Sequence, residues 1–149
     1  MHRLERHQHL PGAPEDVFPF FADALNLERI TPPWLGFRVT GPGAIEMRPG
    51  TLIEYRLRLH RVPVRWLTRI EVWEPPDRFV DLQVRGPYRT WHHEHLFTPA
   101  PDGGTIMRDR VDYDLPLGPL GDLAHRLFVG RDLQRIFDYR AQAVGRVLH

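Results

Sequence analysis

Residues 119–148, PLGDLAHRLFVGRDLQRIFDYRAQAVGRVL, form the one stretch of this chain long enough for a major helix. At about 1.5 Å per residue, such a helix would span roughly 45 Å. Pro119 favours a start there, because the first position of a helix has no partner for its N–H. From about residue 37 to residue 115 the sequence is instead typical of β-strands. One long helix must therefore cover one large sheet.

The strand segments alternate apolar and polar residues and are joined by short turns. Short connections predict antiparallel neighbours. In the predicted strand at residues 64–73, one face would carry Val64, Trp66, Thr68, Ile70 and Val72. An edge strand at residues 4–10 and two short helices between residues 14 and 30 precede these segments. The remaining predicted strands are residues 51–60, 64–73, 78–85, 89–98 and 105–115.

The composition is that of an ordinary globular domain, with 42% hydrophobic and 26% charged residues. The absence of cysteine excludes disulfides, thiolate metal sites and cysteine nucleophiles. A net charge of +1 argues against a nucleic-acid partner, which requires a basic excess on one face. The opening residues MHRLERH do not resemble a signal peptide, and no apolar run reaches membrane-spanning length, so we expect neither a signal peptide nor a membrane span. We therefore expect one domain over residues 1–149, cytoplasmic, with no nucleic-acid partner and no integral membrane association.

The C-terminal stretch does not carry one continuous apolar face. At 100° per residue, the apolar residues of 120–128 fall on one arc and those of 133–148 on another. The change lies beside Gly130, and glycine is unfavourable inside a helix by about 1 kcal/mol relative to alanine. We therefore predict a break or kink near Gly130. Residues 131–148 would then be held against the sheet, and residues 119–128 would form a lid over one end of a cavity.

Four segments carry a resemblance to a known superfamily. They are WEPPDRFVD at 73–81, GPYRTWHHEHLF at 86–97, DRVDY at 109–113 followed by Leu115-Pro116, and IFDYR at 136–140. The chain resembles the START-like, or SRPBCC, superfamily, and within it the polyketide cyclase/dehydrase-like group of bacterial ligand-binding proteins. The resemblance implies an α+β helix-grip fold. In that fold a curved antiparallel sheet of six to seven strands surrounds a long C-terminal helix, with two short helices after the first strand.

A single large helix cannot cover so wide a sheet, so a cavity is expected between the two. Trp91, His93, His95 and Phe97 share one face of their strand, which the aromatic residues mark as the inner face. Two inward imidazoles could contact a ligand, transfer protons, hold a metal or be structural members of a polar core. His-x-His alone does not complete a metal site, so we expect no metal and no cofactor.

The position of Asp81 depends on the length of the following hairpin loop. A two-residue loop pairs Val80 with His93, whereas a three-residue loop, residues 86–88, pairs Asp81 with His93. Pro87 suits the first central position of a turn, which favours the longer loop. The longer loop predicts an inward polar cluster of Asp81, Gln83, His93 and His95.

Three functions are compatible with these observations. The leading one is binding or carriage of a small hydrophobic molecule, such as a lipid, an isoprenoid or a polyketide-like compound. The alternative is a cyclase, dehydratase or aromatase in which His93 or His95 moves protons and Asp81 orients an imidazole. The third is a protein-interaction module. The expected ligand-contacting residues are Trp34, Tyr55, Trp66, Gln83, Trp91, His93, His95, Tyr113 and Phe137.

Overall fold

Seven strands form one antiparallel sheet in the computed structural model, which describes residues 1–41 and 45–148. The spatial order is β1-β7-β6-β5-β4-β3-β2, so successive strands pair except where β1 joins β7. The predicted edge strand is therefore confirmed as β1. The strands are β1 (His2–Leu10), β2 (Arg38–Thr40), β3 (Leu52–Leu59), β4 (Val62–Glu74), β5 (Arg78–Arg85), β6 (Thr90–Pro99) and β7 (Thr105–Asp114).

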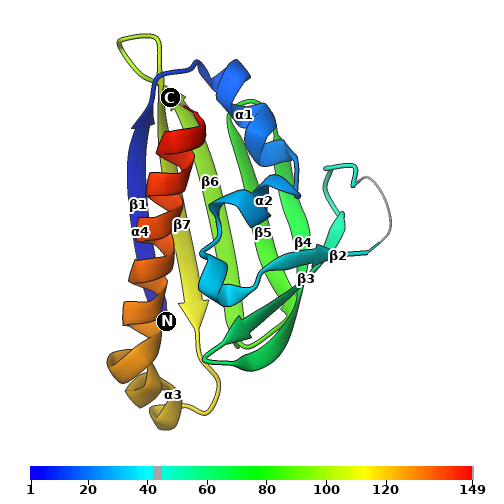
Figure 1. The fold of residues 1–149 in the computed structure, drawn as a ribbon, viewed down its shortest axis with the longest axis vertical. Coiled ribbons are helices and arrows are strands. Elements are labelled where there is room, and N and C mark those ends of the chain that lie inside the picture. The colour runs from blue at the N-terminus through cyan, green and yellow to red at the C-terminus, as the bar shows by residue number, and fades with distance from the viewer. Residues whose placement is uncertain (42–44, 149) are drawn as a thin grey trace.

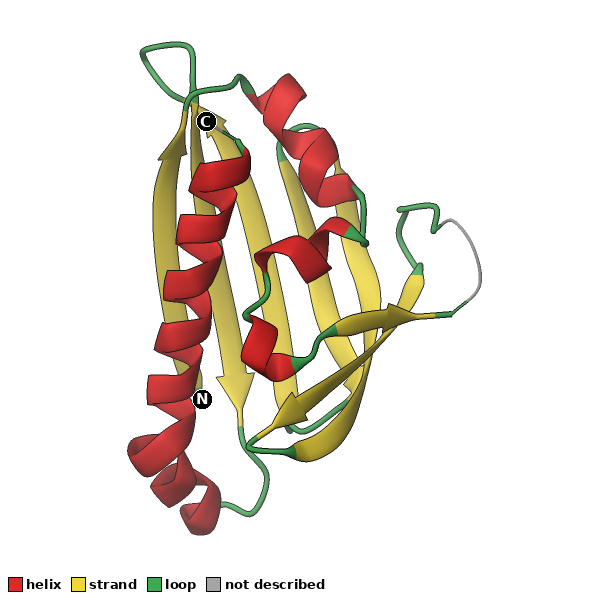
Figure 2. Cartoon of the chain, viewed as in Figure 1, coloured by secondary structure: helices red, strands yellow, loops and turns green. Residues whose placement is uncertain are grey.

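The helices lie on one face of this sheet, with the long C-terminal helix running along β1 and β7 (Figures 1 and 2). Two short helices follow β1, as predicted, and a short 3₁₀ turn follows them. This arrangement is the α+β helix-grip fold. The helical segments are α1 (Pro14–Ala22), α2 (Asn26–Ile30), the 3₁₀ turn Pro33–Leu35, α3 (Pro119–Ala124), a π-helical turn at His125–Val129 and α4 (Gly130–Val147).

The predicted break at Gly130 is wrong, although an irregularity does lie just before this residue. Gly130 has φ −60° and ψ −42°, so the backbone stays helical through it. The irregularity is the π-helical turn immediately before it, where α3 turns away from the axis of α4 (Figure 1). Tyr113 and His125 hold this turn against β7 through a 2.7 Å hydrogen bond between the hydroxyl and Nε2. A single wide turn therefore accommodates the change of apolar face, and glycine is not needed as a breaker.

Helix α4 presents the apolar arc predicted for residues 131–148. Leu133, Phe137, Ala143 and Val144 are buried against the sheet. The apolar arc predicted for residues 120–128 is not buried, because its large side chains are about half exposed or more. These exposed residues are Leu120, Leu123, Leu127 and Phe128.

A β-bulge in β4 changes which side chains face inward. Ile70 pairs with Asp81, but the next pair is Val72 with Val80, so one residue of β4 is skipped. Trp73 consequently lies opposite Phe79, and their rings are 5.4 Å apart. The predicted inner face is correct as far as Ile70. Beyond the bulge, Trp73 takes the inward place that simple alternation gave to Val72.

Apolar side chains gather in three clusters between the sheet and the helices. One joins α1 to β5, β6, β7 and the end of α4, with Phe18, Phe79 and Phe97 at its centre. A second joins β1, β6 and β7 to the start of α4 through Trp91 and Phe137. The third lies on β3 and β4 around Tyr55. Together they leave a space at the middle of the sheet.

Phe97→Ala should lower the free energy of unfolding by about 3–5 kcal/mol, because it opens a cavity in the first cluster. Phe97 is 2% exposed and contacts the rings of Phe18 and Phe21. Urea denaturation would measure the loss. Phe128→Ala is the matched control, since that ring is 57% exposed, and should change stability by about 0.5 kcal/mol or less. Equal effects of the two changes would contradict the assigned core.

Candidate functional site

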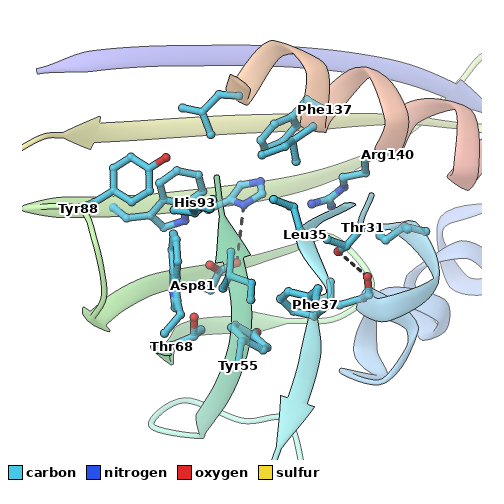
Figure 3. A pocket seen from close by; sticks show the side chains of 18 of the residues that line it. Thr31, Leu35, Phe37, Tyr55, Thr68, Asp81, Tyr88, His93, Phe137 and Arg140 are labelled. Atoms are coloured by element: carbon cyan, nitrogen blue, oxygen red, sulfur yellow. Dashed lines mark hydrogen bonds and ion pairs between the residues drawn. The ribbon is translucent and has the colours of Figure 1, made fainter. Parts of the chain in front are cut away.

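A cavity of about 170 Å³ lies between the central strands, α4 and the segment around α2 (Figure 3). It is partly open to solvent. In Figure 3, Phe137 and Arg140 reach from α4 toward His93, while Tyr55 and Phe37 face them from the side of β3 and β2. Most of the wall is aliphatic or aromatic. The aromatic side chains are Phe37, Tyr55, Trp66, Tyr88, Trp91 and Phe137, and the charged or titratable ones are Asp81, His93, His95 and Arg140.

The histidines come from β6, where alternate residues point to the same face. His93 is 4% exposed and His95 2%. Their imidazole rings stack with centroids 3.7 Å apart, and the ring of Phe79 stacks on the other side of His95 at 3.9 Å. The two imidazoles are therefore fixed in position between aromatic side chains.

Each imidazole turns one nitrogen toward Asp81 and the other toward Asp109. His95 Nε2 lies 2.7 Å from Asp81 Oδ2, and His93 Nε2 lies 2.8 Å from Asp109 Oδ1. The second nitrogens are more distant, with His93 Nδ1 at 3.9 Å from Asp81 Oδ2 and His95 Nδ1 at 3.3 Å from Asp109 Oδ1. The register predicted from the longer loop is confirmed, since Asp81 is the partner of His93 across β5 and β6.

Arg140 completes the cluster from α4. Its Nη2 lies 3.4 Å from Asp109 Oδ1, and the side chain is only 12% exposed. Among the buried polar atoms of the described residues, Arg140 Nε and Nη2 and His95 Nδ1 have no hydrogen-bond partner. A buried polar atom without a partner is unfavourable by roughly 1–3 kcal/mol. The Arg140 nitrogens are donors, so a ligand oxygen that reached them would satisfy them.

The surroundings separate the proton affinities of the two histidines. Burial lowers the pKa of His93 to about 4, and the neighbouring charge of His95 adds to this effect. Burial also acts to lower the pKa of His95, but Asp109 and Asp81 outweigh it and the pKa is raised. Burial acts to raise the pKa of Asp109, yet Arg140 and the imidazoles hold it well below its ordinary value. The two pKa values are thus shifted in opposite directions, so as the pH falls His95 becomes charged before His93.

Six of the predicted ligand-contacting residues line this cavity. They are Tyr55, Trp66, Trp91, His93, His95 and Phe137. They come from four elements (β3, β4, β6 and α4), so the fold brings together residues up to 82 positions apart, as the numbers of Tyr55 and Phe137 show.

The other three lie elsewhere. Trp34 is 51% exposed on the 3₁₀ turn and contacts Tyr139 instead. The Gln83 amide bonds to the backbone N–H and C=O of Tyr88, so it holds the hairpin loop together. The Tyr113 hydroxyl is bonded to His125, at the π-helical turn. Each contacts a partner outside the cavity, and the strand pattern does not reveal these contacts.

The predicted lid is also wrong. Within the described chain, the helical residues that line the cavity from the C-terminal stretch begin at Leu133, and none belongs to residues 119–128. Instead, the tip of the β3–β4 hairpin approaches α4 directly. His60 Nε2 lies 2.6 Å from Asp132 Oδ2 and links the two elements.

Two residues of the cluster were not among the predicted site residues. Asp109 shares a strand face with Val111 and Tyr113, so a carboxylate on an inner face was a usable signal. Arg140 follows Phe137 by three positions, which places both on one side of a helix. Neither signal predicts that Asp109 and Arg140 pair with each other.

The helix-grip fold and the cavity beneath its long helix define a START-like, small-ligand-binding class of domain. The chain belongs to the family described as polyketide cyclase/dehydrase and lipid transport, whose model matches residues 1–148. Membership implies either binding of a small hydrophobic ligand or polyketide cyclase activity.

Solved structures share the fold at low sequence identity. The protein TTHA0849 from Thermus thermophilus is 22% identical with a TM-score of 0.70, over 97% of this chain and 95% of that one. The Zhui aromatase/cyclase from Streptomyces sp. R1128 is 15% identical with a TM-score of 0.74, over 96% and 90%. A START superfamily protein from Mycobacterium smegmatis is 11% identical with a TM-score of 0.68, over 99% of each chain.

A comparison with proteins of curated function finds no match to this chain. Among the described residues, no helix combines the length and the apolar character that crossing a membrane requires.

The pKa of His93 predicts a specific loss of stability in acid. An unfolded histidine takes up a proton near pH 6.5, but folded His93 does so only near pH 4. Between these values the unfolded state binds the extra proton, so the free energy of unfolding decreases as the pH falls. Over this whole pH range, the free energy of unfolding should fall by about 3 kcal/mol because of His93. His95 has a raised pKa, so the stability that it adds is fully present below pH 6.5 and is lost only at higher pH. It therefore does not account for a loss of stability in acid.

Urea denaturation from pH 7 to pH 4, in buffer containing EDTA, should therefore show a steeper decline for the unaltered protein than for His93→Gln. His9→Gln is the control, because His9 is exposed and pairs with exposed Asp102. Identical slopes for the unaltered protein and His93→Gln would contradict the assignment.

Proposed function

We propose that this protein binds a small hydrophobic molecule in the cavity between its sheet and α4. Lipid, isoprenoid and polyketide-like compounds are the candidate classes. The observation that carries the proposal is an apolar cavity with a charged cluster at one position of its wall. Apolar walls with a few placed polar groups are typical of small-molecule sites.

The size of the cavity restricts what it can enclose. Its volume of about 170 Å³ is close to the roughly 150 Å³ of an engineered apolar cavity that binds benzene. One ring or a short chain therefore fits inside, and the remainder of a larger ligand would extend through the open side. The rings of Trp66 and Trp91 meet edge to face at 5.1 Å, and both offer apolar surface to such a group.

The charged cluster supports a ligand with one polar group. Asp81, His93, His95 and Arg140 all line the cavity. Tyr55 and Tyr88 do so as well, and burial raises the pKa of each, so both stay neutral and can donate or accept a hydrogen bond. The proposed ligand is therefore apolar over most of its surface and carries an oxygen where the cluster lies.

A cavity-filling variant tests this proposal. Leu57→Trp adds bulk to the cavity wall and should weaken binding of any compound found by thermal-shift or native mass-spectrometry screening at least tenfold. Leu52→Trp is the matched control on the same strand, since Leu52 is 56% exposed and does not line the cavity. Binding unaffected by Leu57→Trp would place the ligand elsewhere. An absence of hits across lipids, isoprenoids and aromatic polyketide mimics would count against the function itself.

A cyclase or dehydratase is the second candidate, favoured by one specific contact. In many enzymes, an imidazole that transfers protons is held in position by a second group. Asp81 does this for His95 at 2.7 Å, beside an aromatic-lined cavity. His93 or His95 would then move the proton, and Asp81 would orient the ring.

If the protein is such an enzyme, the double change His93→Ala, His95→Ala should lower turnover of a poly-β-ketone substrate mimic by roughly 100-fold or more. The product would be followed by its absorbance after aromatisation. His9→Ala, His60→Ala is the matched control, because both side chains are largely exposed. Turnover that survives the first pair of changes would remove the histidines from any mechanism.

A further inference from the structure

We propose that Asp81, His93 and His95 together bind one divalent transition-metal ion, of the zinc or cobalt type, beside the cavity. Each of the three residues offers a ligand atom, and these atoms lie within 4.8 Å of one another. All three line the cavity. Two imidazoles and one carboxylate are a donor set suited to such ions. The sequence showed only His-x-His, and the register of β5 supplies the third donor.

The spacing of the donors is close to that of a tetrahedral site. With metal–ligand distances of about 2.0–2.2 Å, donors around a tetrahedral ion lie roughly 3.4 Å apart. His95 Nε2 is 2.7 Å from Asp81 Oδ2, and His93 Nδ1 is 3.9 Å from it. The first distance must open and the second close, each by less than about 1 Å, and the two histidine donors lie within 4.8 Å of each other. In Figure 3 the His93 ring and the Asp81 carboxylate face each other across this gap.

Asp109 sets the imidazoles in the tautomer that binding requires. A ligating histidine usually donates the N–H of its other nitrogen to a carboxylate. His93 Nε2 is hydrogen-bonded to Asp109 Oδ1 at 2.8 Å, which leaves Nδ1 free to ligate. His95 Nδ1 is buried without a hydrogen-bond partner, 3.3 Å from the same oxygen. An ion on His95 Nε2 would place the proton on Nδ1, toward Asp109. One carboxylate thus supports both ligands.

The net charge of the cluster is compatible with a bound divalent cation. Asp81 and Asp109 bring two negative charges, and Arg140, which pairs with Asp109, brings one positive charge. With both imidazoles neutral, the cluster therefore lacks one positive charge. A divalent ion that keeps a bound hydroxide or an anionic ligand oxygen would leave the cluster neutral. The fourth position would face the cavity, because the three protein ligands come from the strands behind it.

This inference does not depend on the proposed function, because it concerns the ion alone. The test uses the full chain stripped with EDTA and titrated with ZnCl₂ by calorimetry, with no organic ligand present. We expect one Zn²⁺ per chain and visible d–d absorption when CoCl₂ replaces zinc. Asp81→Asn should weaken Zn²⁺ binding at least tenfold. His9→Gln, which alters an exposed His–Asp pair, should leave it unchanged.

Nitrogen chemical shifts of the unaltered protein decide the outcome if Asp81→Asn does not fold. Zinc should move the ¹⁵N resonances of His93 Nδ1 and His95 Nε2 and leave those of His9 in place. Failure to bind one equivalent of Zn²⁺ would overturn the proposal. So would an affinity lowered less than tenfold in folded Asp81→Asn, or shifts confined to other histidines.

Discussion

The ion cluster around Asp109 is the interaction on which the interior of this protein depends. Its members come from four elements: Asp81 from β5, the histidines from β6, Asp109 from β7 and Arg140 from α4. Removing one partner of a buried ion pair typically lowers stability by about 3–5 kcal/mol, because the other charge is left uncompensated. The charges are therefore satisfied together only when three strands have their native register and α4 lies in place. A slip of one residue in β5 would turn Asp81 to the outer face.

The sequence was sufficient for the architecture because the relevant signals are local. Alternation marks the strands, and the position of Pro87 in its loop was enough to pair Asp81 with His93. Strand alternation carries no signal of the bulge in β4, beyond which Trp73 packs against Phe18 and Phe79. The apolar arcs of the C-terminal stretch likewise do not reveal the π-helical turn, where His125 contacts Tyr113 and His2 from other elements.

The site was predicted less completely than the fold because its geometry combines contacts between distant residues. The two histidines were recognisable from one strand, whereas Asp109 and Arg140 required knowledge of which face of β7 and α4 meets them. Gln83 and Tyr113 illustrate the opposite case. Both have the polarity expected of ligand contacts, but each finds a nearer partner, in the backbone of Tyr88 and in His125. Local polarity identifies candidates, and competition between partners decides among them.

The cluster also bears on what the cavity is for. A site that held only an apolar molecule would gain nothing from buried charges, since apolar replacements of buried ion sets are often neutral or stabilising by about 1–4 kcal/mol. Here the charges lie against the cavity, and three of their nitrogen atoms have no hydrogen-bond partner among the described residues. A ligand oxygen or a metal ion would use those charges, and aromatic walls would position the rest of the molecule. Recognition of one polar atom inside an otherwise apolar space is therefore the property that the proposals share.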